Sequence, residues 1–142
     1  MNAKQYLKQA YRLNEMISSN QEELSALRES ASSIPGIDYS KDKIQSSKSS
    51  GDAGFVNVIS KIIELEDSIN ADIERMYDLK NEIRSVINNV QDADEKLLLR
   101  LRYINFNTWE EICDKLDVSI RTVHRIHSAA LANVIVSKKD TA

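Results

Sequence analysis

The 142-residue sequence is poor in the residues that make turns, with three glycines and one proline. β-Sandwiches, collagen-like arrays and low-complexity chains all need many Gly, Pro or polar turn residues, so this scarcity disfavours them. The single cysteine, Cys113, excludes an intramolecular disulfide framework and a cysteine-based zinc finger, and it suits a reducing cytosol. We therefore expect an all-α protein in the cytoplasm.

Long apolar runs and a strong net charge are also missing. No stretch approaches the ~20 apolar residues that a membrane span requires, and the N-terminus lacks the pattern of a secretion signal. The net charge of −3 alone says nothing about nucleic acid. No glycine-rich phosphate loop, nucleophile elbow or zinc-peptidase motif occurs, so we expect no enzyme, no cofactor and no membrane partner.

Two heptad seams, over residues 1–33 and 55–90, are the clearest patterns present. Their residues recur at steps of four and three, which is typical of coiled-coil helices. The first seam is Tyr6, Ala10, Leu13, Ile17, Asn20, Leu24, Leu27 and Ala31. The second seam is Phe55, Ile59, Ile62, Glu66, Ile69, Ile73, Met76, Lys80, Ile83, Ile87 and Val90. Residues 34–54 have no apolar period and contain Pro35, which predicts a flexible linker.

The two predicted helices, ~46 Å and ~54 Å long, could bury their stripes by folding back as an antiparallel hairpin. The second stripe is wider than one partner needs, because further apolar residues flank it. These are Val56, Val58, Ile63, Leu65, Tyr77, Leu79 and Val86. The surplus width predicts a homo-oligomer, with a dimer favoured. The alternative is a monomeric hairpin capped by the C-terminal residues.

Residues 92–136 read as three short helices. Asp92 with Glu95, and Thr108 with Glu111, are capping-box patterns, and Ser119 can cap the last helix after a turn at Asp117. The expected inward residues are Leu97, Leu98, Leu101, Ile104, Ile112, Leu116, Val118, Val123, Ile126, Ala130 and Val134. Two short helices joined by a tight turn predict a helix-turn-helix, followed by a disordered tail over 137–142.

Charge separates sharply within this segment. Residues 119–139 contain Arg121 and Arg125 but no acidic residue, whereas residues 108–117 contain four. Helical periodicity turns one face of the last helix outward, where guanidinium groups could meet guanine edges and hydroxyls could meet phosphates. The predicted DNA-binding residues are Ser119, Ile120, Arg121, Thr122, His124, Arg125 and Ser128. The alternative is an ordinary solvated helix on an all-α bundle.

Four further residues in this segment have ordinary structural interpretations. His124 and His127 are spaced for one metal ion, but no third ligand lies nearby, so we predict no metal site and histidines that face DNA or solvent. Trp109 is expected to plug the core rather than stack on bases. Cys113 is expected to be a buried spacer.

Residues 108–131 resemble the C-terminal helix-turn-helix of bacterial sigma factors (region 4), and Leu98–Tyr103 resembles the helix that leads into it. The whole arrangement is similar to small phage and prophage proteins of Gram-positive bacteria, including relatives of the ArpU/RinA-type late transcription regulators. The resemblance implies base and backbone contacts at Ile120, Arg121, His124 and Arg125, with Ser119 and Thr122 beside them. Ile120 departs from the basic residue that sigma factors commonly have there, and the aromatic-rich promoter-melting region has no counterpart.

These observations predict a sequence-specific phage or prophage transcription regulator in a bacterial host cell. Its last helix would enter the major groove of double-stranded DNA, and its coiled coil would join subunits. Two alternatives stay open. One is a DNA-packaging component similar to a small terminase subunit, and the other is a protein that contacts RNA polymerase.

Overall fold

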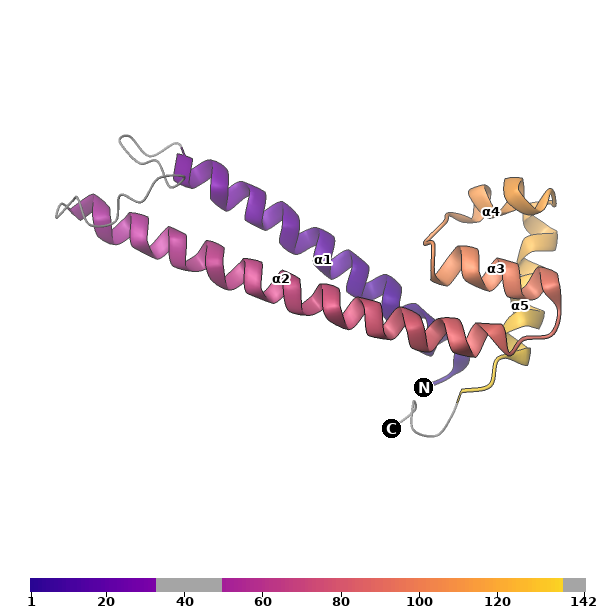
Figure 1. Ribbon diagram of the computed structural model, residues 1–142. Helices are drawn as coiled ribbons and strands as arrows, with labels where there is room; N and C mark the ends of the chain where they lie inside the picture. Colours follow the sequence, from indigo (N-terminus) through magenta and orange to yellow (C-terminus); the bar gives the residue numbers. More distant parts are fainter. Residues whose placement is uncertain (33–49, 137–142) are drawn as a thin grey trace. The chain divides into compact units, whose positions relative to one another are not determined.

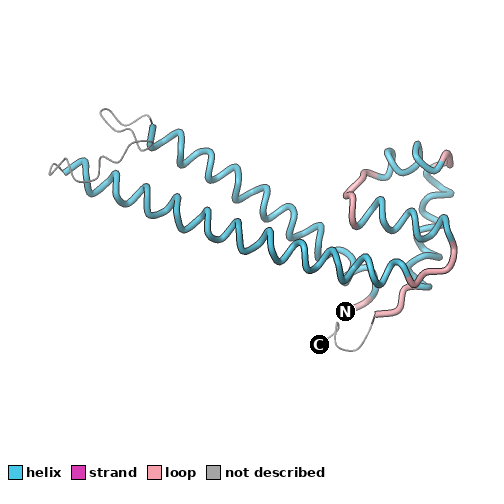
Figure 2. Tube along the Cα trace, viewed as in Figure 1, coloured by secondary structure: helices cyan, strands magenta, loops and turns pink. Residues whose placement is uncertain are grey.

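The computed structural model describes residues 1–32 and 50–136, with side chains from residue 54 onward in the second stretch. The predicted tail 137–142 and most of the predicted linker, residues 34–49, lie outside the described residues. Five helices follow one another: α1 Ala3–Ser32, α2 Ser50–Asn88, α3 Ala93–Tyr103, α4 Trp109–Leu116 and α5 Ile120–Asn133 (Figure 1). Figure 2 shows helices and loops only over these residues, which confirms the all-α class. No described helix is long and apolar enough to cross a membrane.

The chain divides into two compact units. One is Glu15–Glu74, which we call the hairpin unit, and the other combines Met1–Asn14 with Arg75–Ala142. α1 and α2 each pass through both units, whereas α3, α4 and α5 belong wholly to the second. We call these last three helices the C-terminal module.

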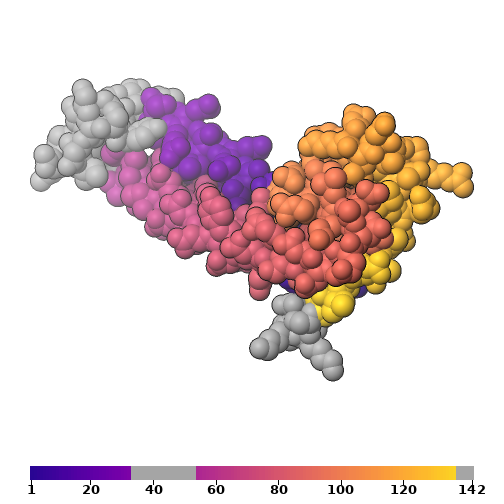
Figure 3. Space-filling view, turned by 45° about the vertical axis from the view of Figure 1, so that its right-hand side comes forward, coloured from indigo at the N-terminus to yellow at the C-terminus, as the bar shows by residue number. Residues whose placement is uncertain are grey.

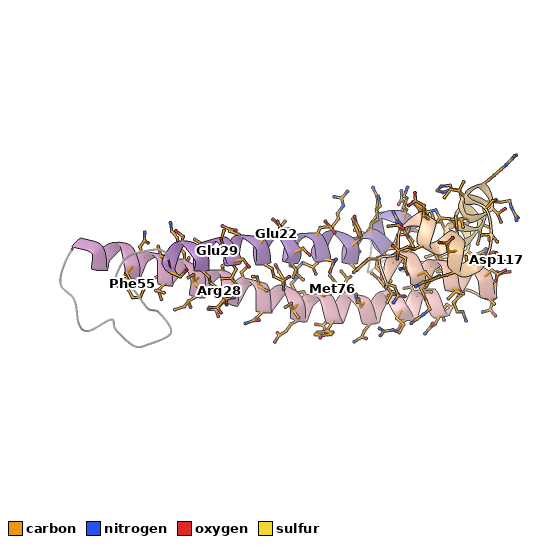
Figure 4. All side chains as sticks on the ribbon, turned by 90° about the horizontal axis from the view of Figure 1, so that it is seen from above. Glu22, Arg28, Glu29, Phe55, Met76 and Asp117 are labelled. Atoms are coloured by element: carbon orange, nitrogen blue, oxygen red, sulfur yellow. The ribbon has the colours of Figure 1, made fainter. Side chains whose placement is uncertain are left out.

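In the hairpin unit, α1 and α2 run side by side in opposite directions (Figures 1 and 4). The buried side chains recur every seven residues, as a heptad seam requires. They are Ile17, Leu24, Ala31, Phe55, Ile62 and Ile69. The positions between them, including the polar Asn20 and Glu66, are half-buried. Both seams are therefore confirmed within this unit.

α2 begins five residues before the predicted start at Phe55, so the end of the predicted linker, residues 50–54, is helical. The prediction was wrong there because it started the helix at the first seam residue. Extending an established helix adds one hydrogen bond for each residue fixed, so a helix continues past the apolar residue that anchors it.

Three of the seven flanking apolar residues of α2 stay exposed. In the hairpin unit, Val56 and Ile63 keep 46% and 52% of their surface exposed, and Val58 and Leu65 are half-buried. In the other unit, Tyr77 is 68% exposed. The surplus apolar width that the sequence predicts is therefore present on the surface of α2.

The second unit has a broader core, to which every helix contributes. It is formed by Tyr6, Leu7, Ala10, Met76, Ile83, Ile87, Val90, Leu98, Leu99, Leu101, Tyr103, Ile104, Ile112, Val123 and Ala130. The prediction for Leu97 was wrong, because it is 43% exposed while Leu99 is fully buried. α3 packs against both α4 and α5, so its buried arc is wider than a single stripe and is rotated away from Leu97. The three helices present one continuous surface in Figure 3.

Candidate nucleic-acid interface

Local hydrogen bonds define the start of α4. The Thr108 hydroxyl accepts from the Glu111 backbone N–H at 3.2 Å, and a Glu111 carboxylate oxygen accepts from the Thr108 backbone N–H at 3.1 Å. This reciprocal pair confirms the predicted capping box. The backbone N–H and hydroxyl of Thr108, and then the Asn107 amide, lower the pKa of Glu111 because each hydrogen bond favours the carboxylate. At Asp92 the structure shows one cap bond, in which the carboxylate accepts from the Glu95 N–H at 3.0 Å.

The turn between α4 and α5 is fixed by two residues. Asp117 adopts left-handed geometry with φ 55° and ψ 51°, a conformation that Asp tolerates better than most residues, and its N–H donates to the Cys113 carbonyl. Ser119 caps α5 by accepting from the Thr122 N–H at 3.2 Å. Both features were predicted, and together they set the direction in which α5 leaves α4.

The small core between α4 and α5 holds the two helices together. Ile112 and Val123 are fully buried, as predicted. Ala130, also predicted, is fully buried. The remaining predicted core residues in and beside these helices are half-buried: Leu116, Val118, Ile126 and Val134. Cys113, predicted to be a buried spacer, is also half-buried. These residues leave the opposite side of α5 to solvent.

That exposed side of α5, which we call the recognition face, holds Ile120, Arg121, His124, Arg125 and Ser128. Ser119 is also exposed, and Thr122 is half-buried. The Ser119 hydroxyl donates to the Thr122 hydroxyl oxygen at 3.1 Å, so both hydroxyls take part in the cap. The structure therefore places all seven candidate residues at one end or on one face of α5, with Arg121 and Arg125 one helical turn apart.

His127 is buried, which corrects the prediction that it faces DNA or solvent. Only 8% of its surface is exposed, and its Nε2 lies 2.7 Å from the Tyr103 hydroxyl of α3. Its spacing of four from Val123 and three to Ala130 puts it on the inward face, and that spacing could have predicted its burial.

Burial keeps the Tyr103–His127 pair uncharged. It lowers the pKa of His127 to about 4, and nearby cations, with Lys4 and Arg102 foremost, act in the same direction. Burial also raises the pKa of Tyr103 to about 12, against the opposing effect of Arg102. A protonated hydroxyl beside a neutral imidazole gives both buried groups a hydrogen-bond partner near neutral pH.

Trp109, predicted to fill the core, is half-buried and connects α3 to α5. Its ring lies 4.9 Å from the ring of His124 and 4.8 Å from the ring of His127. The Arg102 guanidinium lies over the indole at 4.2 Å and donates to the Asn107 carbonyl at 3.0 Å. This cation–π contact places a positive charge from α3 close to the recognition face. In the part of the chain that the structure describes, no group of three His, Cys, Asp or Glu side chains could hold a metal ion.

A family profile described as "Protein of unknown function (DUF1492)" matches residues 34–134, which is more than two thirds of the chain. The matched segment includes α2 and the whole C-terminal module, whereas α1 precedes it. No curated protein and no solved structure matches the chain.

Proposed function

From the premise that the chain belongs to the DUF1492 family, a family of phage-associated proteins, we propose that it is a sequence-specific DNA-binding transcription regulator of a phage or prophage. One observation carries the proposal. A helix of 14 residues, positioned by a capped helix-turn-helix, presents two arginines one turn apart on its exposed face, and it has no acidic residue along its length. Neither arginine forms an ion pair with a residue that the structure describes. The resemblance of residues 108–131 to region 4 of sigma factors supports the same proposal.

The proposed binding mode inserts the recognition face into the major groove. Arg121 and Arg125 would read guanine edges, since a guanidinium can donate two hydrogen bonds to one guanine. The first backbone N–H groups of α5 would contact a phosphate, because the N-terminus of a helix attracts anions. The acidic residues of α4, Glu110, Glu111 and Asp114, are exposed on the other helix, so α5 would approach the duplex first.

Self-association is the second part of the proposal. Operators of helix-turn-helix proteins commonly have two half-sites, which a two-fold dimer reads together. The exposed apolar residues of α2 in the hairpin unit, Val56 and Ile63, support a contact with a second copy. The same residues also favour an alternative function, a DNA-packaging component similar to a small terminase subunit, because such proteins join helix-turn-helix modules through helical segments.

The test is a fluorescence titration of the purified protein with its own upstream genomic DNA and with a scrambled duplex, at two salt concentrations. The genomic fragment should bind more tightly, and binding should weaken as salt rises because phosphate contacts release counterions. Arg121→Ala and Arg125→Ala should each lose ~1–3 kcal/mol of specific affinity with helicity unchanged. Lys61→Ala, which removes an exposed lysine of the hairpin unit, is the matched control.

The outcomes separate the functions. Equal affinity of wild type and both arginine variants for the genomic fragment would remove the assignment of the recognition face. A closed ring of roughly eight or more subunits by mass measurement would favour DNA packaging over regulation. Undetectable DNA binding at low salt would favour a protein that contacts RNA polymerase instead.

A further inference from the structure

The first turns of α1 contain charge of only one sign. Residues 1–14 include Lys4, Lys8 and Arg12 but no Asp or Glu. Residues four apart lie on one side of a helix, so the three cations form a row, which we call the N-terminal cationic row. Lys4 and Arg12 are exposed, and Lys8 is half-buried. None of the three forms an ion pair with any described residue.

This row lies in the same compact unit as the C-terminal module, and the two share a surface hollow. A cavity of about 190 Å³ is lined by Lys8 and Tyr11 of α1 and by Arg102 and Tyr103 of α3. A second hollow, of about 350 Å³, continues along α1 and is lined by Met1, Gln5, Lys8, Gln9 and Arg12. Lys8 lines both hollows, so the cations of α1 extend the positive charge that begins at Arg102.

The positive charges continue from Arg102 to the recognition face. Arg102 lies over Trp109 at 4.2 Å, and Trp109 lies 4.9 Å from His124, which belongs to the recognition face. Lys4, Lys8 and Arg102 all lie close enough to His127 to lower its pKa. The shared cavity and the effect of these cations on His127 are two separate observations. Both show that the N-terminal cationic row lies near the module that carries Arg121 and Arg125.

We propose that Lys4, Lys8 and Arg12 bind backbone phosphates of the same DNA duplex whose major groove receives α5. This inference rests on the proposed function and extends it to α1, which precedes the matched family segment. Four helical residues rise about 6 Å, close to two nucleotide steps of about 3.4 Å along one strand. Unpaired, flexible ammonium and guanidinium groups at that spacing suit a phosphate backbone, which requires positive charge but no base-specific geometry.

The experiment compares Lys8→Gln/Arg12→Gln with Arg28→Gln/Lys61→Gln in the same titration at several salt concentrations. Each double variant removes one lysine and one arginine, but the second pair lies in the hairpin unit. We expect Lys8→Gln/Arg12→Gln to weaken binding to genomic and scrambled DNA by the same factor. The slope of log affinity against log salt should become shallower by about 1 for each lost contact. The control should keep the wild-type slope.

Three results would overturn the inference, and they are distinguishable. In the first, Lys8→Gln/Arg12→Gln keeps the wild-type salt slope while Arg121→Ala still loses sequence preference. The proposed function would then be retained, but the N-terminal cationic row would have no part in DNA binding. A selective loss of the genomic fragment would overturn the assignment to phosphates. Absence of DNA binding by the wild type would remove the proposed function and the inference together. Lys8→Arg/Arg12→Lys keeps both charges, so it should retain the wild-type slope if the first variant acts through charge rather than through folding.

Discussion

The C-terminal module and the hairpin unit bury their apolar side chains in different ways. The module has three short helices, each with an N-cap side chain in place, and its core residues Leu98, Leu99, Ile112 and Val123 are fully buried. Among the described residues of the hairpin unit only every seventh is buried, and Ile63 of α2 stays more than half exposed. The caps satisfy backbone N–H groups at the start of each module helix, whereas a two-helix seam leaves apolar surface uncovered. The contrast favours the proposal that a second copy covers part of the hairpin unit.

The test with the largest expected effect creates a cavity in the core of the C-terminal module. Leu99→Ala should lower the free energy of unfolding by ~2–5 kcal/mol, because Leu99 is fully buried. The packing of α3 against α4 and α5 limits how far neighbouring side chains can relax into the cavity. Leu97→Ala, two residues away on the same helix, is the matched control and should cost less than ~0.5 kcal/mol since Leu97 is 43% exposed. Urea unfolding of both variants measures the difference. Equal losses would mean that the module lacks the rigid core described above.

The second test uses the buried Tyr103–His127 pair. An unfolded histidine has a pKa near 6.5, whereas burial lowers the pKa of His127 to about 4. Between these values the unfolded chain binds a proton that the folded chain does not, so stability falls as pH falls from about 6.5 to about 4. The contribution of neutral His127 to the free energy of unfolding is fully present above pH 6.5. At pH 4 the loss of this free energy is on the order of 3 kcal/mol.

His127→Gln should remove this pH dependence, because an amide keeps hydrogen-bonding capacity without titrating in that range. Thermal unfolding at several pH values from 4 to 7 measures it. His124→Gln removes an exposed histidine from the same helix and serves as the control. A profile for His127→Gln that still falls as steeply as wild type would assign the acid sensitivity to other groups, including the carboxylates of the hairpin unit.

The third test concerns the uncovered surface of α2. Ile63→Lys should weaken self-association at least tenfold, because it replaces a half-exposed apolar side chain, worth ~1–2 kcal/mol when a partner covers it, with a charge. Ser68→Lys adds the same charge at an exposed position on another side of α2 and serves as the control. Sedimentation at several protein concentrations separates the outcomes. Unchanged association of Ile63→Lys would place the subunit contact elsewhere. Absence of association in the wild type would show that the chain is a monomer.

The features that the sequence predicted correctly depend on neighbouring residues. The capping box at Thr108, the left-handed Asp117 and the cap at Ser119 each follow from side chains within four positions of one another. Both seams follow from a repeat of seven, so their buried residues could also be predicted. The same helical period predicts which side of α5 is exposed, whereas DNA binding by the seven candidate residues stays a prediction.

The features that were missed depend on residues far apart in the chain. His127 is buried by Tyr103, which lies 24 positions earlier, and Arg102 stacks on Trp109 across a loop. Phe106 adopts φ 58°, a rare value for a bulky residue. Its ring is held by Tyr11 of α1 at 5.8 Å and Lys80 of α2 at 4.7 Å. No local pattern predicts a conformation that two distant helices fix.

The smallest expected effect concerns the ion pair of the hairpin unit. Arg28 lies on the side of α1 that faces α2, and its Nη2 is 2.9 Å from Glu66 Oε2 (Figure 4). The two side chains are 44% and 41% exposed, so solvent screens the pair and we expect a coupling of only ~0.2–1 kcal/mol. A double-mutant cycle with Arg28→Ala and Glu66→Ala measures it, and added salt should reduce it.

The control for that cycle is Glu66→Leu, which restores an apolar residue at the polar interruption of the seam. If the apolar seam alone stabilises the hairpin unit, the free energy of unfolding of Glu66→Leu should equal or exceed that of the wild type. It should also lose preference for a single register, because polar seam residues specify register at a cost in stability. A coupling well above ~1 kcal/mol between Arg28 and Glu66 would contradict stabilisation by the apolar seam alone. The hairpin unit would then depend on a specific polar contact, as the C-terminal module depends on its caps. The contrast between the two regions would then lie in exposed apolar surface alone.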